Sequence, residues 1–197
     1  MATFRRSLVP VLCVLSTLTL WAQPRPMTFL DMQLMNQQGA PTPSPDGKWM
    51  LYTVSFPDWK EARRQTDLFL VSTSEGLTST KQMTFTTEKN ETAPAWARDG
   101  RAFFFLSNRE APTTAATQTQ LYRMRPDGGE AQRLTDAKDG VSDFVVSRDG
   151  RWIYYRAGRA ETRQLFRIST DKPTVFGAVG LQPDGAAEQL TRQPAGI

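Results

Sequence analysis

The residue types that most often carry enzyme chemistry are scarce in this 197-residue sequence. It contains no histidine, and its single cysteine is Cys13. A Ser-His-Asp triad needs an imidazole as its general base, and most zinc sites use histidine or cysteine ligands. A Gly-x-Ser-x-Gly segment, which would expose a nucleophilic serine on a tight turn, is also missing. We therefore predict no catalytic, metal-binding or cofactor-binding residue in these 197 positions.

Two sets of carboxylates that recur in the repeats could also be considered as catalytic residues. Asp46, Asp99 and Asp149 each precede a glycine, and this is the residue chemistry of a tight turn, which explains all three. Glu91 and Asp143 lie at or near the start of corresponding strands of two repeats. Two carboxylates beside a channel could hydrolyse glycosides, although charged linings without such a role are common.

The Asp-Gly turns belong to a repeat that organises most of the chain. They begin at residues 46, 99 and 149, so the intervals are 53 and 50 residues. Each repeat contains four strand candidates: first strands at 39–44, 93–97 and 141–147; second strands at 49–54, 102–106 and 152–155; third strands at 67–72, 120–125 and 164–169; and fourth strands at 82–84, 133–135 and 189–191. Further turns at 126–129 and 183–185 join third to fourth strands.

The predicted fold class is all-β, with three four-stranded antiparallel meanders that form an incomplete β-propeller. The second strands are apolar on both faces, as in Phe103–Leu106, which indicates sheets stacked between similar sheets. Buried strands of an α/β fold would be the alternative, but the crossover helices they need are not predicted. We assign the blades to residues 41–90, 91–140 and 141–192, with residues 193–197 opening a further blade. Propellers close with about four to eight blades, so three should leave two open flanks.

The segment before the repeats has two parts. Residues 1–22 combine Arg5 and Arg6 with an apolar core from Leu8 to Trp21, which predicts a secretory signal peptide. An uncleaved anchor helix is the alternative, and the short apolar stretch, interrupted by Pro10, argues against it. Residues 23–40 should form a linker and one short helix between Met27 and Gln38, with Thr28 as N-cap. We expect this helix to pack against the first blade.

The charge balance argues against a nucleic-acid partner. The pI is about 9.5, but residues 23–197 hold 22 basic and 20 acidic side chains. The arginines are spread along the sequence instead of being clustered, which is typical of a solvated surface.

Two resemblances to known families add to this interpretation. The pattern Ser-Pro-Asp-Gly-Lys-Trp, an apolar strand, a Leu-Phe or Leu-Tyr strand and a closing Leu-Thr resembles the TolB-type propeller repeat over residues 41–191. The details also resemble the N-terminal propeller of the prolyl oligopeptidase family, especially its exported acylaminoacyl-peptidase and dipeptidyl-peptidase-like members. The segments that carry this second resemblance are 27–32, 51–55, 57–58, 63–71, 94–96, 105–109 and 127–131.

The second resemblance implies a function for the complete polypeptide. In that family the propeller precedes an α/β-hydrolase domain with Ser, Asp and His, and it admits peptides while excluding folded proteins. The chain departs from the pattern by a long link, Asp171 to Gly185, and by stopping before any hydrolase domain. We thus expect an exported serine peptidase, secreted or periplasmic, whose first 197 residues are inactive alone. Its partners would be the downstream hydrolase domain and peptide substrates, without stable membrane insertion after signal cleavage.

Two residues are candidates for peptide contact under this interpretation. Arg109 and Glu110 follow a strand in the segment that resembles the peptidases, and a guanidinium can pair with a peptide carboxylate through two hydrogen bonds. The alternative is a solvated loop arginine. A second hypothesis for the whole chain is a TolB-like periplasmic propeller that binds protein partners and has no catalytic activity.

Overall fold

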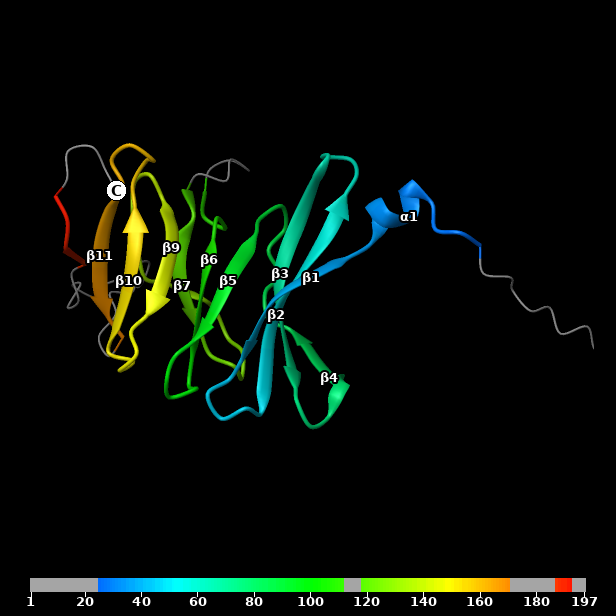
Figure 1. Ribbon diagram of the computed structural model, residues 1–197, viewed down its shortest axis with the longest axis horizontal. Coiled ribbons are helices and arrows are strands. Elements are labelled where there is room, and N and C mark those ends of the chain that lie inside the picture. The colour runs from blue at the N-terminus through cyan, green and yellow to red at the C-terminus, as the bar shows by residue number, and fades with distance from the viewer. Residues whose placement is uncertain (1–24, 112–117, 171–186, 193–197) are drawn as a thin grey trace, which may run out of the picture.

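The strands form three antiparallel sheets that stand side by side (Figure 1). The computed structural model describes residues 25–111, 118–170 and 187–192. Blade 1 contains β1 (Gln37–Pro43), β2 (Trp49–Asp58), β3 (Arg63–Ser72) and β4 (Gly76–Gln82); blade 2 contains β5 (Glu91–Trp96), β6 (Phe103–Ser107), β7 (Gln120–Met124) and β8 (Gln132–Arg133); blade 3 contains β9 (Val141–Val146), β10 (Trp152–Ala157), β11 (Gln164–Ser169) and β12 (Glu188–Gln189). Within each blade the strands are paired in chain order. The predicted all-β class with three four-stranded meanders is confirmed, and the three blades do not close into a ring.

The Asp-Gly turns connect the first and second strands of each blade. In blade 1 the Gly47 amide donates to the Ser44 carbonyl at 2.9 Å, and Gly47 has a φ of 71°. The Ser44 hydroxyl donates to Asp46 at 2.6 Å and accepts from the Trp49 amide at 3.0 Å. Blade 3 repeats these bonds with Ser147, Asp149, Gly150 and Trp152. The aspartates therefore stabilise turns, as their sequence context predicted.

The threonine that closes each repeat, preceded by Met83 in blade 1 and by leucine in blades 2 and 3, has a structural role. The third strand of each blade contains an Asp-Leu or Gln-Leu pair. The threonine hydroxyl accepts a hydrogen bond of 2.9 Å from the backbone amide of this leucine, and it donates to the side chain of the preceding Asp or Gln. The three sets are Thr84 with Leu68 and Asp67, Thr135 with Leu121 and Gln120, and Thr191 with Leu165 and Gln164. These bonds hold the chain just after the outer strand against the third strand in all three blades.

The core consists of two apolar layers, one between each pair of neighbouring blades. The layer between blades 1 and 2 includes Leu68, Leu70, Phe103 and Tyr122. The layer between blades 2 and 3 includes residues from both sheets, among them Phe104, Leu121 and Ile153. Every residue of β6 is buried because successive side chains enter opposite layers. A strand with two dry faces is what stacked blades require.

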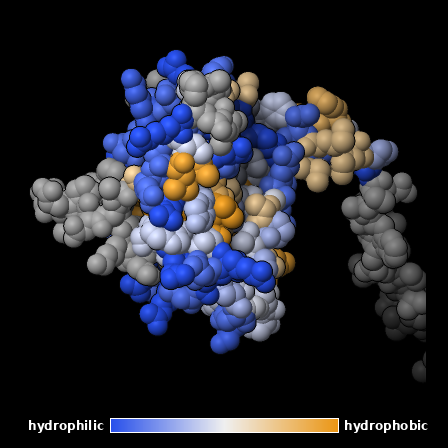
Figure 2. Space-filling model, turned by 60° about the vertical axis from the view of Figure 1, so that its left-hand side comes forward, coloured by the Kyte–Doolittle hydropathy of each residue, from blue (hydrophilic) through white to orange (hydrophobic). Residues whose placement is uncertain are grey.

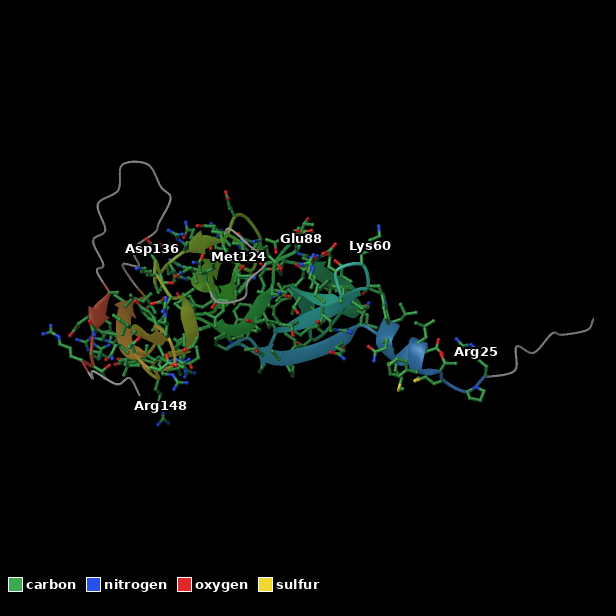
Figure 3. The ribbon with its side chains drawn as sticks, turned by 90° about the horizontal axis from the view of Figure 1, so that it is seen from above. Arg25, Lys60, Glu88, Met124, Asp136 and Arg148 are labelled. Atoms are coloured by element: carbon green, nitrogen blue, oxygen red, sulfur yellow. The ribbon has the colours of Figure 1, made fainter. Side chains whose placement is uncertain are left out.

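The helix before blade 1 differs from the sequence expectation. Helix α1 (Phe29–Leu34) begins with the predicted cap, in which Thr28 and Asp31 form a capping box. It is shorter than expected because the chain is already extended at Gln37, where β1 starts. None of its residues is buried, so the expectation that it packs against the first blade is wrong. The helix lies beyond the end of the sheet (Figure 1), and Figure 3 places Arg25 there, far from Arg148 of blade 3.

Some of the expectations concern residues that lie outside the described ranges. These are the signal peptide at 1–22, the turn at 183–185, the link from Asp171 to Gly185 and the segment 193–197. Among the described residues, no helix is both long and apolar enough to cross a membrane. Figure 2 shows hydrophobic side chains surrounded by hydrophilic ones on the side where blade 3 lies, and a second apolar group on α1.

Candidate functional site

Two buried carboxyl groups meet at the junction of blades 1 and 2. Asp67 of β3 is 2% exposed, and Glu91, the first residue of β5, is 0% exposed. A parallel β-bridge links Thr66 to Asn90, the residue before β5, and the Thr66 amide also donates to the side-chain oxygen Asn90 Oδ1 at 2.9 Å. This bridge places the next residue of each segment at the interface of the blades.

Glu91 is held by donors from blade 2 and from the loop that precedes it. Ser107 Oγ donates to Glu91 Oε1 at 2.8 Å, and Thr86 Oγ1 lies 2.8 and 3.0 Å from its two oxygens. Arg109 adds an ion pair at 3.3 Å. Hydrogen bonds to a charged group are stronger than neutral ones, so this set can offset the cost of burying Glu91.

Asp67 has weaker support. It accepts from Gln65 Nε2 and from Thr84 Oγ1, both at 3.2 Å. Burial is the main cause that raises the pKa of Asp67 to about 6, and the nearby Glu91 carboxylate raises it further. Below that pH the Asp67 carboxyl keeps a proton and can share it with Glu91.

Arg109 completes this cluster, which we call the inter-blade carboxyl cluster (Asp67, Glu91 and Arg109). Its guanidinium carbon lies 5.3 Å from the ring centre of Phe105 and 4.9 Å from that of Tyr122, within cation–π range. The side chain is only 18% exposed. A carboxyl with a pKa of about 6 suits proton transfer, but the burial of Asp67 and Glu91 leaves no open face for a substrate. The geometry therefore supports a structural role, in which the cluster joins two blades.

The predicted peptide-contact residues lie in one loop but have different partners. Arg109 is paired with Glu91, as described above. Glu110 is about half exposed and pairs with Arg133 at 2.7 Å. Contact of Arg109 or Glu110 with a peptide stays a prediction, and of the two Glu110 is the more accessible.

The structure does not bring Glu91 and Asp143 together as a catalytic pair. Asp143 lies on β9, where Arg156 of β10 donates to both of its oxygens. Glu91 lies in blade 2 and pairs with a different arginine. Each carboxylate is paired with an arginine of its own blade, which gives no support to the glycoside-hydrolysis hypothesis.

Trp96 and Trp152 make packing contacts within the blades. Trp96 is buried, makes an edge contact with Phe103, and donates its indole N–H to the Thr42 carbonyl at 3.0 Å. Arg167 lies over the ring of Trp152 at 4.3 Å. Within the described ranges, no three His, Cys, Asp or Glu residues lie close enough together to hold a metal ion.

Sequence reasoning did not identify Asp67 as part of a cluster. One signal was available, because the corresponding positions of the other repeats are Gln120 and Gln164, so the acid is the exception. Asn90 and Asn108 were also missed, although the Asn90 amide donates to Asn108 Oδ1 at 2.8 Å and supports the same junction.

Comparison with known proteins identifies relatives for part of the chain. No protein-family model matches it. Dipeptidyl-peptidase 5 of Porphyromonas endodontalis is 31% identical over 114 residues, which are 58% of this chain and 15% of that protein. The chain is similar to the propeller part of prolyl oligopeptidase-family peptidases. The match spans only 15% of the relative, so the similarity concerns its propeller segment alone.

Solved structures agree on the propeller fold. Acylaminoacyl peptidase of Pyrococcus horikoshii matches with a TM-score of 0.56 and 11% identity, over 81% of this chain and 26% of that one. TolB of Acinetobacter baumannii matches with a TM-score of 0.53 and 23% identity, over 78% of this chain and 32% of that one. Identities this low show the fold alone, and both kinds of propeller are equally compatible with the blades.

Proposed function

We propose that this chain is the propeller segment of an exported serine peptidase, and that the propeller controls which peptides reach a hydrolase domain of the same polypeptide. The observation that carries the proposal is the 31% identity with a dipeptidyl-peptidase, which exceeds the identity with any of the propeller structures described above. The inter-blade carboxyl cluster also supports the proposal. A propeller that selects peptides by size needs blades with fixed spacing, and the cluster joins blade 1 to blade 2.

The coding DNA gives the first test. Reading beyond the codon for Ile197 should reveal a Gly-x-Ser-x-Gly segment followed by Asp and His, in the order typical of α/β-hydrolases. Further Asp-Gly repeats followed by a stop codon would contradict the peptidase proposal.

The filter itself is tested on the whole polypeptide. It should cleave a short peptide amide and leave the same bond intact in a folded protein, because only the peptide passes the propeller. Equal cleavage of both substrates would refute size selection while leaving peptidase activity in place.

A second candidate is a protein-binding propeller of the TolB type. It is favoured by the structural match to TolB, which covers 78% of this chain. This candidate requires no hydrolase segment in the DNA, and the same sequencing experiment separates the two.

A further inference from the structure

The two interfaces between blades differ at one repeat position. Leu70, Arg123 and Arg167 occupy the same place in the three third strands. Leu70 is 1% exposed and lies in the apolar layer between blades 1 and 2. Arg123 is paired across the sheet with Phe104, which belongs to the layer between blades 2 and 3. Blade 2 therefore has an arginine on the face turned toward blade 3, at the position where blade 1 has a buried leucine.

A cleft lies at this position, between the Asp-Gly turns of blades 2 and 3. Its volume is about 320 Å³, which is within the range of pockets for small ligands. The charged groups of its lining are Arg98, Asp99, Arg123, Asp149 and Arg151, and Phe104 contributes to its apolar part.

Arg98 and Arg123 are the two cations of the cleft that lack a partner among the described residues. Arg151 is paired with Asp149 at 2.7 Å, so these two charges balance one another. The other acid, Asp99, accepts from the Arg101 amide at 3.0 Å. Two guanidinium groups then face one carboxylate, and the cleft carries a net positive charge.

In blade 3, the arginine at the same repeat position forms an ion pair. Arg167 pairs with Glu188 at 2.7 Å and lies over Trp152. On the outer strand β8, the residue opposite Arg123 is the uncharged Gln132, in the place that Glu188 takes in β12. Half-buried charges are costly unless they are paired, and Arg123 is a half-buried cation without an ion pair among the described residues.

We propose that this cleft binds an oxyanion, the carboxylate or phosphate group of a small molecule, between Arg98 and Arg123. The planar fork of a guanidinium donates two parallel hydrogen bonds to either group. The volume of the cleft admits a molecule of roughly the size of an amino acid or a sugar phosphate.

Calorimetric titration of the whole polypeptide with inorganic phosphate, and separately with N-acetylglycine, tests the proposal. Saturable binding of at least one is expected, and the stronger of the two identifies the group. Arg123→Leu, which introduces the residue of blade 1, should weaken binding about tenfold or more. Arg125→Leu is the matched control, because Arg125 follows the same strand but is exposed and paired with Asp127, and it should leave the affinity unchanged.

Three results would overturn the proposal. The first is no saturable binding of either probe, and the second is equal affinity in the wild-type protein and Arg123→Leu. The third comes from thermal unfolding without ligand, where Arg123→Leu should not lower the Tm because leucine suits an apolar interface. A clear loss of Tm would show that Arg123 has a structural partner instead.

Discussion

Arg109 shows how a residue that looks like a binding group can serve the fold. It was predicted as a peptide contact, yet its guanidinium pairs with the fully buried Glu91 and lies over Phe105 and Tyr122. Arg109→Ala should lower the free energy of unfolding by about 3 kcal/mol, because it leaves Glu91 buried without its cation. Urea unfolding followed by tryptophan fluorescence measures the change. Arg159→Ala is the control, since its exposed pair with Asp139 should be worth less than about 1 kcal/mol, and equal losses would contradict the assignment.

Asp67 makes the stability of the blade junction depend on pH. Its pKa is raised from 3.8 to about 6, so between these values the folded protein holds a proton that the unfolded chain has lost. The contribution of Asp67 is therefore fully present below pH 4 and is lost as the pH rises through 6. The loss should not exceed about 3 kcal/mol, because a pKa difference of one corresponds to about 1.4 kcal/mol. Other carboxylates titrate in this range too.

Comparison with Asp67→Asn isolates this effect. The amide cannot titrate, so the difference in unfolding free energy between the wild-type protein and the variant should shift in favour of the variant between pH 4 and 6. Urea titrations at four or five pH values give this difference. A difference that stays constant over the whole window would show that Asp67 titrates normally.

At the scale of elements, the Asp-Gly turns differ in how closely the blades approach them. Gly47 and Gly150 have φ values of 71° and 75°, so alanine is strained at both. A Cβ at Gly47 would meet no atom within 4 Å, whereas at Gly150 it would lie 2.8 Å from Arg98 Cβ in blade 2. We expect Gly47→Ala to cost about 1 kcal/mol of unfolding free energy and Gly150→Ala clearly more, in the same urea titration. Equal costs would mean that the two blades separate easily at this turn.

The strands were predictable because each one appears three times, whereas the contacts between blades were not. Repeated turns and apolar runs located the first three strands of each blade to within a few residues, apart from the longer ends of β2 and β3. The outer strand β4 was predicted only at its end, because Gly76–Lys81 is polar and lacks alternation. The carboxyl cluster was missed since Asp67 and Glu91 are distant in sequence and meet only when blades stack. The N-cap of helix α1 was predicted correctly, but a cap sequence does not indicate what the apolar face of the helix contacts.

At the scale of the whole molecule, the three blades expose apolar surface that a closed ring would cover. Phe29 of α1 is 70% exposed, Leu77 of blade 1 is 85% exposed and Val145 of blade 3 is 60% exposed. Residues 23–197 expressed alone should therefore aggregate or bind a hydrophobic dye such as ANS. Light scattering and dye fluorescence measure this directly. Phe29→Ser should remove only part of the dye signal, because the flanks of blades 1 and 3 remain, while a cooperatively melting, dye-free monomer would show that the open flanks are covered in solution.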